Sequence, residues 1–324
     1  RELAELDAAM FDDPSAGAVV LAQRVGAQLF DALLSGELRS TYDVARSVTR
    51  EAGEGLRIKL RVNAPELATL PWEFLFDQRR GAFVALSRYT PLVRYAEVAA
   101  PDRPLAVTSP LRVLGVAASP DGVEPLDIAE EQRRVEAAFA PLVEEGQLEL
   151  TWLTPPTWRA LQAAMQAGPW HVLHFVGHAE LNGENGEPAV ILADDGGEAL
   201  HLSAGQLADL LVDQRTLRLA VLNACEGARG HDDSVFSSMA ATLVLRGLPA
   251  VVAMQYAITD DAAVEFSASF YAALANLYPV DGALAEARKA MSLAEPNSLE
   301  WATPVLHLRA PDGAIFIANE ADDE

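Results

Sequence analysis

The sequence LRLAVLNACEGARG, at residues 217–230, decides the fold. Its apolar run from Leu219 to Leu222 is typical of a strand buried on both faces of a parallel sheet. The run stops at Asn223, and Cys225, the single cysteine of the chain, follows where the strand should leave the sheet. In open α/β sheets, ligands and reactive groups collect at the carboxyl ends of strands. The thiol is therefore a candidate nucleophile, which needs a base.

A second apolar run supplies a candidate base. Residues 170–178 read WHVLHFVGH, which predicts a buried strand that ends at Gly177 and His178. If this strand is parallel to the one before Cys225, both side chains emerge at the same edge of the sheet. His178 stands roughly 50 residues before Cys225, which is the arrangement of caspases.

Each of these residues also has a purely structural interpretation. A lone cysteine in an intracellular protein is most often a small buried hydrophobic residue. His171 and His174 fall inside the predicted strand, where packing roles are expected. His178 follows a glycine at a strand end, which better fits a reactive side chain. The paired placement favours a Cys225–His178 dyad.

Both motifs, together with several further segments, resemble the CHAT family, the caspase-like domains often attached to TPR repeats. The two motifs are GHAE after HVLHFV and LNACEG after LRLAV. The other similar segments are LPWEFL at 70–75, VVAMQY at 251–256 followed by Thr259-Asp260, AEAR at 285–288 and WATPVL at 301–306. The resemblance covers most of the chain, from about residue 15 to 318. The chain departs from the family at Ala179, where relatives often have glycine. At the position where caspases have glutamine it has Asn223, which is usual for the CHAT family.

This resemblance implies an α/β fold, a caspase-like three-layer sandwich with a mostly parallel central sheet, preceded by a degenerate caspase-like N-terminal half. Strands and helices alternate in the pattern from residue 111 to 254, which also favours a parallel α/β sheet. The stretch from Val98 to Pro110 is typical of a linker. We therefore expect a pseudo-caspase-like region at residues 1–105 and an active peptidase domain at residues 106–324.

Composition narrows the class of protein further. Of the 324 residues half are apolar, and 47 acidic against 24 basic residues give a formal net charge of −23. This charge argues against direct binding of nucleic acid or anionic membranes. No apolar run reaches the roughly 18 residues of a membrane helix, no signal peptide is visible, and one cysteine suits a reducing cytoplasm, so we expect a cytoplasmic protein. A start at Arg1 rather than Met fits a domain of a longer protein.

The expected activity is that of a cysteine endopeptidase without cofactor or metal. Cys225 attacks the scissile carbonyl as a thiolate, and His178 assists the thiol and then protonates the leaving amine. The resemblance to caspase-like enzymes places the oxyanion donors at the backbone N–H groups of Ala179 and Cys225. The acidic turn at residues 180–187 lacks the EF-hand pattern, so a calcium site is not expected there.

Three residues are candidates for substrate binding. By strand alternation, Asn223 would point toward the floor of the substrate pocket. Gln255 and Asp260 follow the neighbouring predicted strand and would line the pocket. Asp260 could favour a basic P1 residue by its charge, or it could be the N-cap of the next helix.

Among possible functions, the resemblance favours a regulated protease that cleaves a partner protein in bacterial signalling, antiviral defence or cell death. Some CHAT relatives cleave gasdermin-like pore formers, so such a companion protein is an expected substrate, and a sensor or TPR-type region is an expected regulator. A catalytically silent caspase-like scaffold is the alternative, although both motif residues are present. A different α/β hydrolase or acyltransferase is disfavoured because Asn223 stands where a nucleophile elbow has its first glycine.

Overall fold

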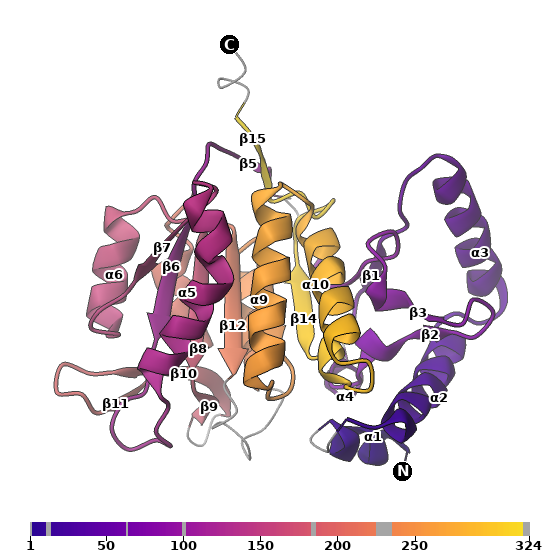
Figure 1. Ribbon diagram of the computed structural model, residues 1–324, viewed down its shortest axis with the longest axis horizontal. Coiled ribbons are helices and arrows are strands. Elements are labelled where there is room, and N and C mark those ends of the chain that lie inside the picture. The colour runs from indigo at the N-terminus through magenta and orange to yellow at the C-terminus, as the bar shows by residue number, and fades with distance from the viewer. Residues whose placement is uncertain are drawn as a thin grey trace.

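An eight-stranded sheet forms the centre of the molecule. The computed structural model describes residues 2–10, 14–62, 64–98, 102–182, 186–224 and 235–319. The sheet has the order β1-β4-β14-β13-β12-β8-β6-β7 (Figure 1). Its strands are β1 (Ile58–Leu60), β4 (Leu92–Tyr95), β6 (Leu111–Ala117), β7 (Leu148–Trp152), β8 (Val172–Gly177), β12 (Leu219–Ala224), β13 (Ala250–Met254) and β14 (Pro304–Leu308).

The direction of the strands changes once across the sheet. Neighbouring strands from β7 to β13 are parallel, β13 and β14 are antiparallel, and β14, β4 and β1 are again parallel to one another. The carboxyl ends of β8, β12 and β13 therefore share one edge of the sheet. The expectation of a mixed α/β fold with a mostly parallel central sheet is confirmed.

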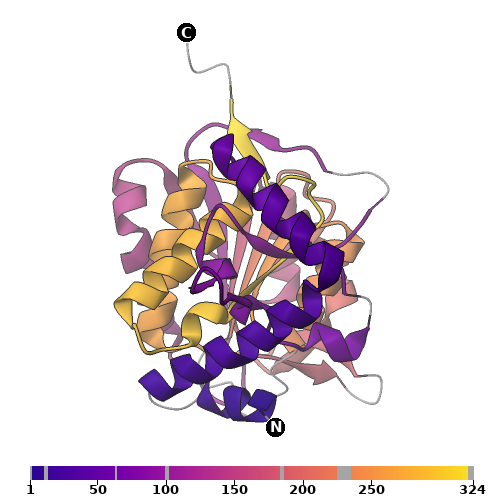
Figure 2. The same cartoon turned by 90° about the vertical axis from the view of Figure 1, so that its right-hand side faces the viewer.

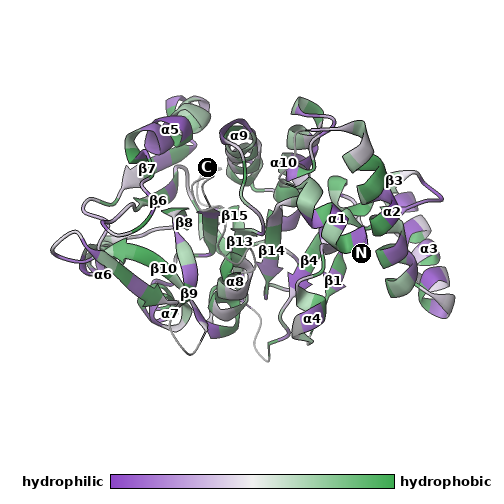
Figure 3. Ribbon diagram, turned by 90° about the horizontal axis from the view of Figure 1, so that it is seen from below, coloured by the Kyte–Doolittle hydropathy of each residue, from purple (hydrophilic) through white to green (hydrophobic). Residues whose placement is uncertain are grey.

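Two layers of helices cover the sheet and complete the sandwich (Figure 3). In one layer, α5 and α10 pack on either side of α9. In the other layer, α6 and α8 pack on either side of α7. These helices are α5 (Ile128–Glu144), α9 (Asp260–Ala275), α10 (Val280–Ala294), α6 (Trp158–Ala167), α7 (Ala204–Leu211) and α8 (Val235–Arg246). Short local signals set where several of them begin: Thr157 caps α6, and Ser203 with Gln206 forms a capping box on α7.

The N-terminal region lies at the β1 end of the sheet, where α2 and α3 cross in front of it in Figure 2. It contains α1 (Glu2–Ala9), α2 (Ala16–Leu33), α3 (Gly36–Glu51), the single turn α4 (Pro65–Ala68), and the small sheet of β2 (Phe76–Asp77) and β3 (Ala82–Phe83). Because β1 and β4 belong to the central sheet, residues on both sides of position 105 share one sheet. The division into two caspase-like halves at that position stays a prediction.

The remaining elements are short. β5 (Leu105–Val107) pairs with β15 (Phe316–Ala318), and 3₁₀ helices occupy Trp72–Phe74, Val84–Leu86 and Glu300–Ala302. Over the ranges that the structure describes, no single helix has both the length and the apolar character to cross a bilayer; the bent pair α2–α3, with 104° between its helices, passes that test only jointly.

A buried ion pair joins the N-terminal region to the sheet. Arg94 of β4 binds the carboxylate of Glu73, with 3.0 Å between Nη2 and Oε2, and both side chains are buried. The same nitrogen donates to Oε1 of Gln255, directly after β13, at 2.9 Å. Arg94 also donates to the carbonyl oxygen of Ala68. The guanidinium is thus compensated by groups from three separate segments, as a buried charge requires.

Replacing Glu73 by Gln is expected to destabilise the protein by about 3–5 kcal/mol, because it leaves Arg94 buried without a counter-charge. Chemical unfolding monitored by tryptophan fluorescence measures this loss. Glu97→Gln is the control, since Glu97 pairs with Arg61 at the surface and should cost far less. Equal losses in the two variants would contradict the role given to Glu73.

Buried histidines make stability depend on pH. Burial lowers the pKa of His174 to about 4. Burial and the nearby Arg94 lower the pKa of His307 to about 3. In the unfolded chain both histidines take up a proton near their ordinary pKa of 6.5, whereas in the folded protein they take it up only at a lower pH. This contribution to stability is therefore complete above about pH 6.5 and is lost as the pH falls toward 4.

We expect His174→Gln to flatten the dependence of unfolding free energy on pH between about 6.5 and 4.5, by up to about 1 kcal/mol per pH unit. The variant should also be less stable at pH 7, because it disturbs the hydrogen bond of 2.8 Å between His174 Nδ1 and the Tyr271 hydroxyl. Denaturant titrations at several pH values measure both effects. The partly exposed His201 offers the matched variant His201→Gln, and an unchanged slope in His174→Gln would refute this account.

Candidate active site

The candidate site lies where β8 and β12 end side by side. The two strands are parallel neighbours, and the last pair in their register is Gly177 with Ala224. His178 and Cys225 are the next residues after these two positions in the sequence. Cys225 itself lies outside the described residues. The structure therefore fixes the two strand ends from which the predicted dyad would emerge.

A close backbone contact determines the end of β8. The N–H of Ala118, just after β6, donates to the carbonyl oxygen of Val176 at 3.0 Å. A Cβ atom on Gly177 would lie 2.9 Å from the carbonyl oxygen of Ala118 and 2.9 Å from Cζ of Phe175. Only glycine fits this position without displacing the neighbouring segment. The glycine before His178 thus has a packing reason.

His178 is held between the central sheet and a small antiparallel sheet. Its side chain is buried, at 5% exposure, and its carbonyl oxygen accepts a hydrogen bond of 3.0 Å from the N–H of Ile191. The small sheet contains β9 (Ala179–Asn182), β10 (Glu187–Ala193) and β11 (Ala199–Ser203), visible near the lower edge of Figure 1. The sequence Asp194-Asp195-Gly196-Gly197 is typical of a turn, and it connects β10 and β11 as a hairpin, with Ala193 opposite Ala199.

Asn223 carries an orphaned acceptor close to the strand ends. Its side chain is 5% exposed, and Oδ1 has no hydrogen-bond partner in the described part of the chain. Asn223 pairs in register with Val176, and Val176 pairs with Ala117. Alternation from Val221, opposite His174, places Asn223 on the face covered by α5 and α9, because His174 contacts Tyr271 of α9. A buried acceptor of this kind is unstable unless a donor reaches it.

The other two candidate substrate residues lie on opposite faces of the sheet. Asp260 begins α9 and pairs with Arg134 of α5, with 2.7 Å between Nη2 and Oδ2, so it lies on the same face as Asn223. The N-cap of α9 is Thr259, so the interpretation of Asp260 as the cap is wrong. Gln255 belongs to the other face, where it binds Arg94 and lines a cavity beside α8.

In the part of the chain that the structure describes, acidic and histidine side chains do not gather into a metal site. Within the described ranges, no group of three or more His, Asp or Glu residues has a geometry that could hold a metal ion. Glu180, two residues beyond His178, forms a close pair with His201 on the small sheet.

A scan of family models matches the CHAT domain over residues 23–309. The chain belongs to the CHAT domain family. Among solved structures, two crystal structures of the Saccharomyces cerevisiae separase–securin complex, at 3.0 and 2.6 Å resolution, are similar to this CHAT chain. The TM-scores are 0.39 and 0.37 at 16% and 13% identity, with 74% of this chain covered in each. The CHAT chain spans 14% and 15% of the chains it matches there. The search of curated proteins found no match.

Several polar residues of this CHAT domain were not singled out in the sequence as parts of a site. Ser237 of α8 and His307 of β14 share a hydrogen bond of 3.1 Å and are both buried. The buried pair of Arg94 and Glu73 was also missed. A charged residue inside an otherwise apolar strand, as Arg94 is in Leu92–Tyr95, was the available signal.

Gly177→Ala is expected to destabilise the CHAT domain by about 1–3 kcal/mol, because the added methyl group collides with the backbone of Ala118. Thermal unfolding measures this effect. Gly282→Ala is the matched control: a Cβ at that position, inside α10, has no neighbour within 4 Å, so the change should be neutral or stabilising. A neutral Gly177→Ala would disprove the close contact.

Proposed function

We propose that this CHAT domain is a cysteine endopeptidase with Cys225 as nucleophile and His178 as general base and acid. One observation carries the proposal: β8 and β12 are adjacent parallel strands whose last paired residues, Gly177 and Ala224, directly precede His178 and Cys225. Two side chains that follow adjacent parallel strands can meet at one sheet edge, which is where α/β proteins place their chemistry. Membership in the CHAT family is consistent with this assignment.

The chemistry follows from the two groups. His178 takes the thiol proton, and the Cys225 thiolate attacks the scissile carbonyl carbon to form a tetrahedral oxyanion. Collapse of this intermediate breaks the C–N bond, and the imidazolium gives its proton to the departing amine. A water molecule, deprotonated by His178, then hydrolyses the thioester and restores the thiol.

The backbone at Ala179 supports an oxyanion donor. Ala179 pairs with Val190 of β10, and this pair is flanked by the bond from Ile191 N–H to the His178 carbonyl oxygen. Directly opposite residues in an antiparallel pair alternate between bonded and non-bonded types. The Ala179 N–H is therefore of the type that points away from β10, which leaves it available as an oxyanion donor in this proposal. The Cys225 N–H is the second proposed donor.

Asn223 is the best supported of the proposed substrate contacts. Its buried Oδ1 lacks a donor in the described part of the chain, so an N–H or O–H of a bound peptide could supply one. Asp260 on the same face is already paired with Arg134, and a basic P1 side chain would have to compete with that guanidinium. We further propose that the substrate is a companion protein of the organism that makes the chain.

The proposal predicts that both dyad variants lose cleavage. A proteome-derived peptide library is incubated with the wild type, Cys225→Ala, His178→Gln and the control His171→Gln. His171 precedes the same strand at its opposite end, and its Nδ1 accepts a hydrogen bond from Arg112 N–H that a glutamine can replace. We expect cleavage by the wild type and the control, and a loss of roughly 10³-fold or more in both dyad variants.

Labelling by a thiol-reactive probe separates a latent enzyme from a scaffold. The chain has one cysteine, so all labelling reports on Cys225. Fast labelling that slows in His178→Gln, even without cleavage, supports a dyad that awaits an activator. Equal and slow labelling of the wild type and His178→Gln would refute the dyad and favour the scaffold.

A further inference from the structure

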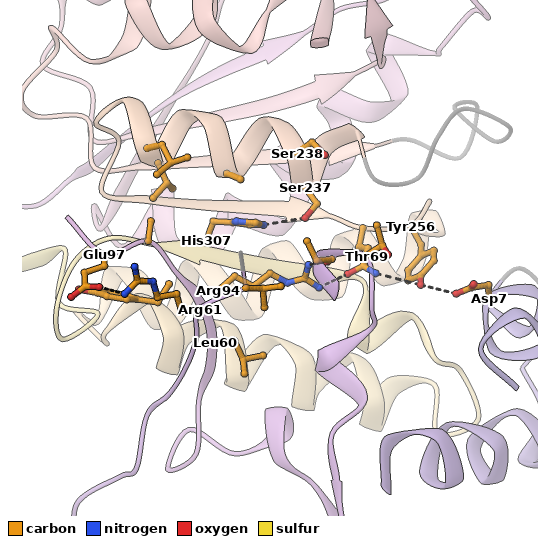
Figure 4. A pocket seen from close by; sticks show the side chains of 18 residues that line it. Asp7, Leu60, Arg61, Thr69, Arg94, Glu97, Ser237, Ser238, Tyr256 and His307 are labelled. Atoms are coloured by element: carbon orange, nitrogen blue, oxygen red, sulfur yellow. Dashed lines mark hydrogen bonds and ion pairs between the residues drawn. The ribbon is translucent and has the colours of Figure 1, made fainter. Parts of the chain in front are cut away.

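A cavity of about 780 Å³ lies on the α8 face of the sheet, away from the face to which Asn223 points. Its walls come from segments far apart in the chain: Asp7 of α1, the end of β1 and the two residues after it (Leu60 to Val62), Ala68 and Thr69 at the end of α4, the end of β4 and the two residues after it (Arg94 to Glu97), one side of α8, Gln255 and Tyr256 after β13, and His307 of β14. Figure 4 shows these side chains along the space between α8 and the N-terminal segments. The volume is in the range of pockets that hold small organic ligands.

The cavity occupies a gap in one helical layer. In Figure 3, α8 covers the region of β13 and the short α4 lies at β1, and no longer helix of the described chain lies between them over β14 and β4. The cavity wall on α8 extends from Ser237 to Leu245, which corresponds to about 12 Å along the helix. An occupant would therefore be elongated and would lie along α8.

The described lining residues offer no free positive charge to an anion. The two guanidinium groups among the described lining residues are both paired, Arg94 with Glu73 and Arg61 with Glu97. His307 is neutral at pH 7, because burial and then Arg94 lower its pKa to about 3. Burial and the nearby Asp7 raise the pKa of Tyr256, so its hydroxyl is neutral too and donates to Asp7 at 3.0 Å.

The rest of the walls combine aliphatic surface with hydrogen-bonding groups, among them Thr69, Ser237 and Gln255. Leu60, Val62, Ala241, Val244 and Leu245 supply aliphatic surface. Against this surface, Ser237 and His307 form a hydroxyl–imidazole pair, whose dashed contact is visible at the centre of Figure 4. Aliphatic surface beside precisely placed polar groups is a usual combination in small-molecule sites.

We propose that this cavity binds a neutral, elongated small molecule that has an aliphatic body and a few hydrogen-bonding groups. The paired guanidinium groups and the carboxylate of Asp7 exclude an anionic ligand, and the aliphatic walls give the occupant its affinity through the area it removes from water. Hydroxyl or carbonyl groups on the ligand meet Ser237 and Gln255.

The ligand would act on the proposed active site through α8. This helix begins at Val235, immediately after residues 225–234, which include the proposed nucleophile, and Ser237 and Ser238 in its first turn line the cavity. An occupant would contact this turn on one side and the N-terminal segments on the other. The coupling rests on the proposed function, whereas the binding does not.

The binding is tested with Nile red, a neutral solvatochromic dye, against the anionic dye anilinonaphthalene sulfonate. We expect saturable binding of Nile red to the full chain with a blue-shifted emission, and binding of the anionic dye that is roughly tenfold weaker or less. Ala241→Trp fills the cavity from α8, and Val62→Trp fills it from the opposite wall. Both should weaken Nile red binding roughly tenfold or more, whereas the adjacent Thr242→Trp, which does not line the cavity, should not.

The outcomes are distinguishable. Nile red binding that survives both filling variants, or equal binding of the two dyes, would overturn the neutral small-molecule site. No binding to the folded wild type would also overturn the small-molecule site, and a protein segment would then be the expected occupant of the cavity.

The coupling to the proposed active site is tested separately. Saturating Nile red should change the labelling rate of Cys225 by about fivefold or more in the wild type and in Thr242→Trp. An unchanged labelling rate would overturn the coupling but not the binding. A failure of the wild type to cleave peptides would contradict the proposed peptidase but not the binding of the small molecule.

Discussion

The buried guanidinium of Arg94 brings together segments that lie far apart in the sequence. A charge in a protein interior persists only with a counter-charge and filled hydrogen bonds. Here Glu73 supplies the charge, and Gln255 and the carbonyl oxygen of Ala68 supply acceptors, so four segments must meet at one point. A second arginine, Arg288, donates to the carbonyl oxygen of Pro304 nearby in the fold. Each of four segments that carry the family resemblance, at 70–75, 251–256, 285–288 and 301–306, therefore contributes a residue to these buried contacts.

Much of the sheet could be predicted from the sequence, because its central strands are continuous apolar runs that fit only a doubly covered parallel sheet. The runs before Cys225 and His178 are of this kind, and so is Ala250–Met254. The position of β1 and β4 could not be predicted in this way. Ile58–Leu60 alternates apolar and basic residues, and Arg94 interrupts β4, so neither resembles a core strand. Their place in the central sheet depends on pairing with β14, which is more than 200 residues away in the sequence.

For the candidate site, the sequence predicts the strand ends and the hairpin beside His178 but not the surroundings of the substrate residues. Strand ends follow from local hydrophobicity, and the hairpin follows from the turn residues at 194–197. The contacts of Asp260 and Gln255 depend instead on partners from other elements, Arg134 and Arg94, that no local pattern indicates. Thr259, and not Asp260, is the N-cap of α9. The difference is one residue, which is the usual margin by which helix ends are misplaced.

The insertion of β14 between β13 and β4 also sets the order of events during synthesis. Strands β6, β7, β8, β12 and β13 can assemble as soon as residue 254 has been made, since each pairs with another of this group. β4 has no neighbour in the central sheet other than β1 until Pro304–Leu308 emerges. The first hundred residues therefore wait for nearly the whole chain before they join the sheet, a contact of high sequence separation that is formed slowly. A nascent chain would hold β1 and β4 apart from the rest of the central sheet, within reach of chaperones, until β14 pairs with both β13 and β4.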